Sequence, residues 1–272
     1  MDSRTDVAIA VAQFAPGDDA AANLAEIARL AALAAARGAR VVVFPEYSSL
    51  FTPQAGEAWL AAAEDVEGGA FTTALAGLAA ALDVHLVAGM LERRPDDPRR
   101  VSNTVVAVAP VGGVVARYRK LHLYDAFGQR ESDWVAPGDV EPPELFEAEG
   151  LRFGLQTCYD VRFPEVTRRI VDARADVVLM PAEWVRGPLK EAHWRTLTTA
   201  RALENTVYVA AADHAPPVGA GNSMVVDPMG VELATIGEEA SVALAWVSRE
   251  RIDAVRRLNP ALALRRFTVA ER

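Results

Sequence analysis

The chain runs from VAIAVAQ (7–13) through an Ala- and Leu-rich segment (23–36) to VVVFPE (41–46). Valine-rich apolar runs of this length predict buried β-strands, whereas the apolar spacing of the middle segment predicts a helix. The turn GDD at 17–19 can supply the N-cap of that helix, and Gly38 can end it. This stretch is therefore predicted to form a strand, a helix and a second strand.

The same alternation continues along the chain and predicts an α/β protein whose sheets are buried on at least one face. Further strands are expected at 85–90, 102–108, 114–118, 153–157, 177–180, 207–212, 224–226 and 242–247. Further helices are expected at 70–82, 164–173, 189–204 and 250–258. A charged loop is expected at 92–100 and a long functional loop at 120–144. No break in composition marks a boundary, so residues 1–272 are expected to form a single domain.

Composition narrows the class of partner. The chain has 272 residues, a formal net charge of −9 and a pI near 5.1, without a basic run. These features argue against nucleic acid or an anionic membrane as partner and favour a small soluble molecule. A single cysteine allows no internal disulfide and no CxxC motif, which favours a reducing, cytoplasmic location. We expect neither a signal peptide nor a transmembrane helix, because the apolar runs are too short for either.

Three chemically distinct side chains follow predicted strands, where open α/β folds place ligands and catalytic groups. Glu46 and Cys158 come after apolar strands, and Lys120 ends a third. Such a set forms a nucleophile with its activators, since a nearby cation lowers the pKa of a thiol and a carboxylate can carry its proton. The chain has no GxSxG, HExxH or P-loop motif. A lone cysteine is more often a small core residue, so the residues alone leave that alternative open.

Lysine usage singles out one of these residues. Of the 28 basic residues, only Lys120 and Lys190 are lysine. The lysine ammonium is a compact charge that can approach a developing oxyanion, whereas the guanidinium of arginine is larger and planar. A lysine at position 120 is therefore expected to be required for activity. Replacement of Lys190 by arginine is expected to leave activity nearly unchanged.

Three segments carry a specific resemblance to a known family. FPEYS (44–48), YRKLHLYD (118–125) and CYDVRFPE (158–165) resemble the three catalytic signatures of the nitrilase superfamily of carbon-nitrogen hydrolases, in the family's order. ARALEN (200–205) and NSMVVDPMG (222–230) resemble further blocks of that family. The resemblance covers nearly the whole chain.

The resemblance implies a role for each residue of the site. Glu46 would be the general base, Lys120 the oxyanion-stabilising lysine and Cys158 the nucleophile. Glu131 would be the second glutamate that accompanies them. The backbone N–H of Tyr159 would complete the oxyanion site. The implied reaction is acyl transfer through a thioester, with no metal and no organic cofactor.

The resemblance also implies a fold and a substrate class. The fold would be a single-domain α-β-β-α sandwich that pairs through an outer helical layer into a homodimer or a higher homo-oligomer. HLYD and CYDVRFPE most resemble the ω-amidase and deaminated-glutathione amidase branch, so the favoured substrate is a small amide, in particular the ω-amide of a dicarboxylate. The alternatives are an N-carbamoyl amide hydrolase, a nitrilase and, in a different class, a non-catalytic binding relative.

Four further side chains are candidates for the substrate pocket. Tyr124, Glu183 and Trp184 lie where family members line the pocket, although a tryptophan at a strand end also suits simple packing. Arg162 either ties down the turn after the cysteine or receives a substrate carboxylate with its paired N–H groups. The histidines show no metal-ligand spacing and are expected to be structural.

Overall fold

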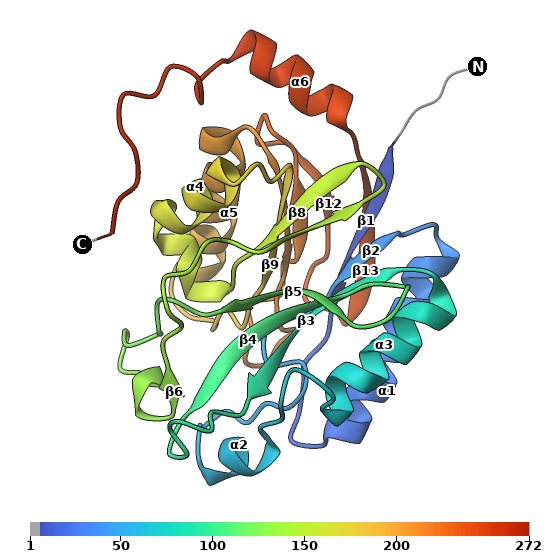
Figure 1. Cartoon of the computed structure of the whole chain (residues 1–272), viewed down its shortest axis with the longest axis vertical. Coiled ribbons are helices and arrows are strands. Elements are labelled where there is room, and N and C mark those ends of the chain that lie inside the picture. Colours follow the sequence, from blue (N-terminus) through green and yellow to red (C-terminus); the bar gives the residue numbers. More distant parts are fainter. Residues whose placement is uncertain (1–5, 272) are drawn as a thin grey trace.

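Two β-sheets face each other at the centre of the computed structural model, which describes residues 6–271 (Figure 1). Within these residues, the first sheet has the strand order β13 (Ser241–Val247), β1 (Val7–Gln13), β2 (Val41–Val43), β3 (His85–Glu92), β4 (Val101–Val108) and β5 (Val114–Arg119), and β6 (Val135–Ala136) pairs with β4. The second sheet has the order β12 (Glu232–Thr235), β11 (Met224–Val226), β10 (Tyr208–Ala212), β9 (Val177–Pro181), β8 (Leu151–Leu155) and β7 (Leu145–Ala148). Both sheets mix parallel and antiparallel pairs.

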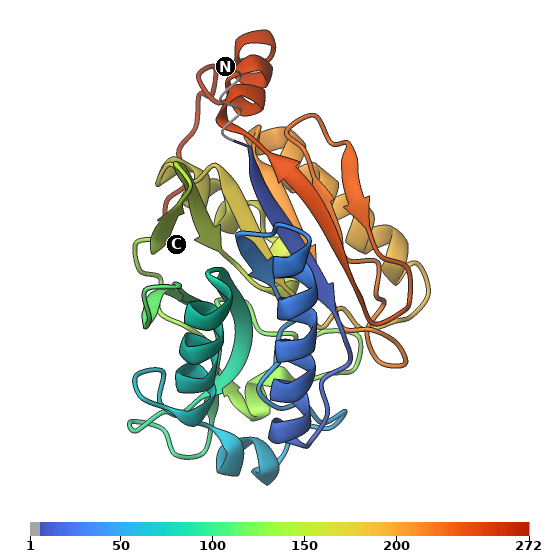
Figure 2. The same ribbon diagram turned by 90° about the vertical axis from the view of Figure 1, so that its right-hand side faces the viewer.

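Helices cover the outer face of each sheet. The first sheet carries α1 (Ala20–Ala36) and α3 (Ala70–Leu82), which face the viewer in Figure 2. The second sheet carries α4 (Pro164–Asp172) and α5 (Lys190–Asn205) on its other side. A continuous apolar cluster fills the space between the sheets. The predicted α-β-β-α sandwich is therefore confirmed, whereas the single domain and the pairing through a helical layer stay predictions.

Two short helices lie outside these layers. The first, α2 (Glu57–Ala62), packs with Tyr47 and Phe51 at one end of the first sheet. The second, α6 (Arg249–Leu258), follows β13 and lies apart from both helical layers in Figure 1. No helix within residues 6–271 is long and apolar enough to cross a membrane.

The first strand-helix-strand unit forms as its residues predict. Asp19 caps α1 by accepting hydrogen bonds from the backbone N–H groups of Ala21 and Ala22. Gly38 follows the helix with a φ of +95°, a left-handed conformation that glycine adopts without strain. The strands on either side, β1 and β2, then pair in parallel.

Several local elements differ from the sequence-based expectation. The expected charged loop at 92–100 is wrong for Glu92, which ends β3, is buried and binds Arg119 at 2.5 Å. Arg119 of β5 and Thr104 of β4 both donate hydrogen bonds to this carboxylate and hold the glutamate in the sheet. The sequence analysis also missed α2, β6, β7 and β12, which are short and carry few apolar residues in a regular pattern.

Candidate active site

Glu46, Lys120 and Cys158 converge at one end of the two facing sheets. Glu46 follows β2, Lys120 follows β5, and Cys158 follows β8 of the opposite sheet. All three side chains are buried. Because the residues come from both sheets, packing of the sheets against each other is what brings the carboxylate and the thiol together.

The turn that carries Glu46 depends on a close backbone approach. Gly89 of β3 lies against this turn, and a Cβ atom at that position would come within 2.6 Å of the backbone nitrogen of Tyr47. The backbone of Glu183, in the opposite sheet's loop, donates its N–H to Glu46 Oε2 at 2.7 Å. The glutamate is thus fixed by both sheets.

Three donors orient the Glu46 carboxylate. Besides the Glu183 N–H, Asn103 Nδ2 and Lys120 Nζ donate to Glu46 Oε1, at 2.6 and 2.9 Å. Oε2 accepts one hydrogen bond among the described residues, from the backbone N–H of Glu183. This geometry gives one carboxylate oxygen to the side chains of Lys120 and Asn103 and the other to the backbone of the opposite sheet's loop.

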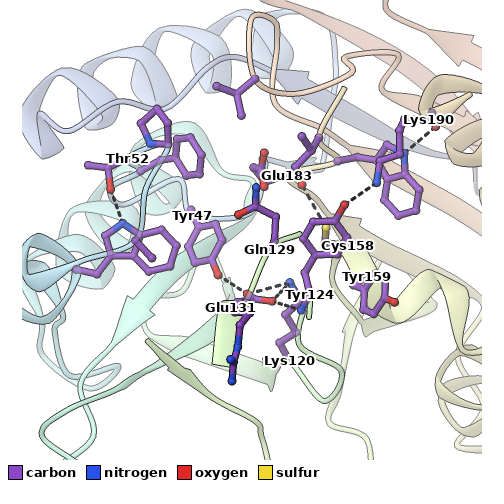
Figure 3. Close-up of a pocket in the computed structure, with 18 residues that line it drawn as sticks. Tyr47, Thr52, Lys120, Tyr124, Gln129, Glu131, Cys158, Tyr159, Glu183 and Lys190 are labelled. Atoms are coloured by element: carbon purple, nitrogen blue, oxygen red, sulfur yellow. Dashed lines mark hydrogen bonds and ion pairs between the residues drawn. The ribbon is translucent and has the colours of Figure 1, made fainter. Parts of the chain in front are cut away.

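Lys120 bridges two glutamates. Its Nζ lies 2.9 Å from Glu46 Oε1 and 2.9 Å from Glu131 Oε2, and the side chain is 2% exposed. Burial opposes the charge, but the Glu131 and Glu46 carboxylates outweigh it and hold the pKa of Lys120 well above its usual range. Lys120 therefore stays an ammonium ion at the base of the site (Figure 3).

Glu131 fastens the long loop at 120–144 to the site. It begins a short 3-10 turn and accepts hydrogen bonds from the Tyr47 hydroxyl and the Tyr124 backbone N–H, each at 2.5 Å. Together with its ion pair to Lys120, these contacts use both carboxylate oxygens. The predicted long functional loop therefore reaches the site through this glutamate.

Cys158 occupies a strained backbone position at the start of a 3-10 turn over Cys158–Arg162. Its φ is +44°, in the left-handed region that a non-glycine residue seldom adopts. The Sγ donates to the backbone oxygen of Glu183 at 3.4 Å. This turn places the thiol beside the Glu183 backbone and in the wall of the cavity.

The expected lowering of the thiol pKa is wrong. Burial and then the Glu46 charge raise the pKa of Cys158 well above its usual range, and the opposing effect of Lys120 is smaller. Lys120 is already neutralised by two glutamates, so it stabilises a thiolate less than a free cation would. The thiol accordingly rests protonated, and a base must remove its proton as it attacks.

This protonation state predicts the pH dependence of alkylation. The rate at which methyl methanethiosulfonate, a small uncharged reagent, modifies Cys158 should rise steadily between about pH 7 and 9.5 without a plateau. Glutathione under the same conditions provides the control, because its free thiol titrates within that range. Mass spectrometry of timed samples gives the rates. If the rate for Cys158 reached its plateau at a lower pH than the rate for glutathione, the pKa of the Cys158 thiol would be lowered instead.

A cavity of about 140 Å³ opens onto the thiol and is walled largely by aromatic rings. Lys120, Glu131 and Cys158 line it, together with Tyr47, Phe51, Trp59, Tyr124, Tyr159, Glu183, Trp184 and Lys190. The candidates Tyr124, Tyr159, Glu183 and Trp184 are thus brought to the cavity. Arg162 is not among the described lining residues. Its guanidinium instead lies 4.8 Å from the Trp184 ring centroid, beside His193.

Glu183 brings a third carboxyl group to the cavity. Its Oε1 is buried and has no hydrogen-bond partner among the described residues. Burial, followed by the charges of Glu46 and Glu131, raises the pKa of Glu183 well above its usual range. The group is therefore a neutral acid that can donate as well as accept a hydrogen bond.

Three residues of the site escaped the sequence analysis. Asn103 binds both Glu46 and Glu131, Tyr47 binds Glu131, and Lys190 lines the cavity. A usable signal existed for Asn103, because it is a buried polar residue within the otherwise apolar strand β4. Lys190 had been signalled by lysine scarcity but was expected to be silent.

The histidines near the site make structural contacts. His214 Nε2 lies 2.7 Å from the backbone oxygen of Glu46, and burial lowers the pKa of His214 to about 4, so the ring is neutral and serves as donor. His122 Nδ1 lies 2.7 Å from Asp160, which also accepts from the Tyr118 hydroxyl. Asp160 thereby ties the strand before Lys120 to the turn after Cys158. Among residues 6–271, no group of three His, Cys, Asp or Glu side chains is placed to hold a metal ion.

Two facing sheets between helical layers, with a buried glutamate, lysine and cysteine at one end, are the features of the nitrilase superfamily. Residues 8–257 match the family model described as carbon-nitrogen hydrolase. The chain belongs to this family.

Relatives and solved structures agree with this assignment. The chain is 46% identical to a deaminated glutathione amidase of Escherichia coli O157:H7 over 173 residues, which span 64% of this chain and 65% of that protein. It is 30% identical to an omega-amidase of Homo sapiens over 245 residues, 86% of this chain and 85% of that one. A mutant amidase from Nesterenkonia sp. AN1, with the acetamide moiety of fluoroacetamide added covalently at its active-site cysteine, shares 26% identity. It superposes with a TM-score of 0.76 over 97% of this chain and 98% of that one.

Proposed function

We propose that this protein hydrolyses the C–N bond of a small amide to a carboxylate and ammonia through a thioester on Cys158. The observation that carries the proposal is Lys120, held between Glu46 and Glu131 beside a buried thiol. A structural cysteine needs no buried ammonium and no oriented carboxylate next to it. Two amidases among the relatives, and the covalent adduct at the cysteine of the Nesterenkonia amidase, support the same reaction class.

The first half of the reaction forms the thioester. Glu46 takes the proton of the Cys158 thiol as the sulfur attacks the amide carbonyl carbon, and the carbonyl electron pair moves to the oxygen. The Lys120 ammonium and the backbone N–H of Tyr159 stabilise the resulting oxyanion. Glu46 then gives its proton to the departing nitrogen, the C–N bond breaks and ammonia leaves.

The second half regenerates the thiol. A water molecule takes the place of ammonia, Glu46 removes its proton, and the oxygen attacks the thioester carbon. Collapse of the second tetrahedral intermediate breaks the C–S bond. The proton held by Glu46 returns to the sulfur of Cys158, and the carboxylic acid is released.

The surrounding residues position these groups. Glu131 holds Lys120 in place beside the substrate amide. The neutral Glu183 carboxyl, with one unpartnered oxygen, binds a polar group of the substrate. Tyr124 and Trp184 form the wall against which the acyl chain packs.

A small ω-amide of a dicarboxylate is the favoured substrate. The cavity volume of about 140 Å³ suits an acyl group of few heavy atoms. N-carbamoyl amides and nitriles stay the alternatives within the family. A non-catalytic binding protein is disfavoured because all four residues of the catalytic set are present and converge.

Ammonia release from a substrate panel tests the proposal. The panel contains ω-monoamides of dicarboxylic acids, neutral aliphatic amides, an N-carbamoyl amino acid and an aliphatic nitrile, each incubated with the wild-type protein and with Cys158→Ala. We expect Cys158-dependent ammonia from amides, fastest from the ω-monoamides. Turnover of the carbamoyl compound or the nitrile alone would favour an alternative, and no ammonia from any compound would favour the binding relative.

A further inference from the structure

Lys190 is a buried cation whose surroundings are aromatic. It is the first residue of α5, is 6% exposed and lines the cavity. Its Nζ lies 4.6 Å from the Trp184 ring centroid, 4.8 Å from that of Phe127 and 4.9 Å from that of Tyr124. The aromatic faces stabilise the charge without neutralising it.

The ammonium of Lys190 has no carboxylate at ion-pair distance among the described residues, although the Glu183 and Asp213 carboxyl groups lie near enough to act on its charge. Among the described residues, the Lys190 ammonium forms no salt bridge, and its single side-chain hydrogen bond goes to the Tyr124 hydroxyl at 3.1 Å. An ammonium carries three N–H donors, so two of them are left for a ligand. A buried cation without an anion is costly to fold, and burial lowers the pKa of Lys190 accordingly.

Lys190 stands across the thiol from the catalytic lysine. In Figure 3, Lys190 lies on the opposite side of the Cys158 sulfur from Lys120 and Glu131. A substrate whose carbonyl carbon sits at the sulfur, with its oxygen toward Lys120, would therefore extend its far end toward Lys190. The cavity lining connects the two positions.

Two other cations near the cavity fit this role less well. Arg130 lines the cavity but is exposed and pairs with Asp133 at 3.6 Å. Arg162 is outside the described lining and packs its guanidinium on Trp184. Lys190 alone of the three is buried, lines the cavity and is free of a carboxylate partner within the described residues.

We propose that Lys190 binds the carboxylate at the far end of the substrate and so selects ω-amido acids over neutral amides. This inference rests on the proposed amidase function and assigns its substrate class to one side chain. The anion supplies the missing counter-charge and accepts the free N–H groups. The neighbouring Arg162 charge adds to the attraction without contact.

Binding to a protein that cannot turn over tests the contact directly. The probes are succinamate and succinamide, which share chain length and reactive amide but end in a carboxylate and a neutral amide. Calorimetric titration of Cys158→Ala and of Cys158→Ala with Lys190→Met gives both affinities. We expect the second substitution to weaken succinamate binding about tenfold or more, the loss of a charge-assisted hydrogen bond, and to leave succinamide binding little changed.

Matched variants separate charge at this position from other effects. Lys190→Arg retains part of the selectivity, whereas Arg99→Met, a substitution of an exposed arginine outside the described cavity lining, leaves both affinities unchanged. Lys190→Met should melt no lower than the parent protein, because removal of an unpaired buried charge does not destabilise the fold. A purely structural lysine would instead lower the melting temperature and weaken both probes equally.

Each remaining outcome decides one claim. Equal loss of both probes, a selective loss in Arg162→Met or Arg130→Met in place of Lys190→Met, or no binding of succinamate would overturn the assignment of Lys190. If one of these results were found while the wild-type protein still hydrolysed both amides, the amidase proposal would stand and only the role of Lys190 would be wrong. Lys190-dependent succinamate binding without any ammonia from the wild type would establish the anion site and overturn the amidase proposal.

Discussion

Replacement of Cys158 by alanine is expected to reduce amide hydrolysis by about 10⁴-fold or more, because no other described group in the cavity can form the thioester. Cys158→Ser should lose nearly as much. A serine hydroxyl is much less acidic than a thiol, and burial beside the Glu46 charge already disfavours an anion at this position. Initial rates of ammonia release with the best amide of the panel measure both effects.

The loss must be separated from unfolding. The side chain is small and 5% exposed, so Cys158→Ala should lower stability by only about 1 kcal/mol, which thermal unfolding and near-ultraviolet circular dichroism can check. Mass spectrometry of the wild type mixed rapidly with substrate should show an acyl adduct on Cys158. Near wild-type turnover by a folded Cys158→Ala protein would rule out the thioester.

Lys120→Arg is expected to lower kcat by about 10³-fold although the charge is kept. The Nζ atom is enclosed between Glu46 and Glu131 at 2.9 Å from each, and a planar guanidinium is too large for that space. It would displace the two carboxylates and with them the general base. The fall should appear in kcat for succinamate and succinamide alike, since the oxyanion is common to both.

Lys190→Arg provides the matched control, because it makes the same chemical change at the other lysine. The effect of Lys190→Arg should be confined to the KM of succinamate, because Lys190 is proposed to contact the far end of the substrate rather than the reacting carbonyl. If Lys120→Arg retained wild-type kcat, or if the two substitutions had the same kinetic signature, the oxyanion role of Lys120 would be wrong.

The sequence predicted most long elements, and it singled out three residues that the fold brings together at one end of the sheets. β1, α3, α4 and α5 agree with their predicted ranges to within a residue or so, because their apolar periodicity is a local signal. Glu46, Lys120 and Cys158 were found for a similar reason. Each lies in a short sequence motif at the end of a predicted strand. The three could therefore be selected as candidate site residues without tertiary information.

Other parts of the site have no local signal. Glu46 and Lys120 are 74 positions apart, and Asn103 reaches both Glu46 and Glu131 only when β4 is packed beside the other strands. The sequence also left Arg162 between two roles, and replacement of Lys190 by arginine was expected to be nearly silent. Their sequence positions do not tell which cation turns toward the cavity and which packs on Trp184.

The sequence by itself therefore determined the α-β-β-α class, the order of the long elements and the three residues proposed as nucleophile, base and oxyanion-stabilising lysine. The tertiary structure decided their chemical states. The pKa of the Cys158 thiol depends on how deeply the thiol is buried and on how much of the Lys120 charge is already neutralised by Glu46 and Glu131. Burial and charge act through space between residues that are distant in the chain. The raised pKa of the Cys158 thiol and the position of Lys190, without an ion-pair partner within residues 6–271, therefore appear only in the folded protein.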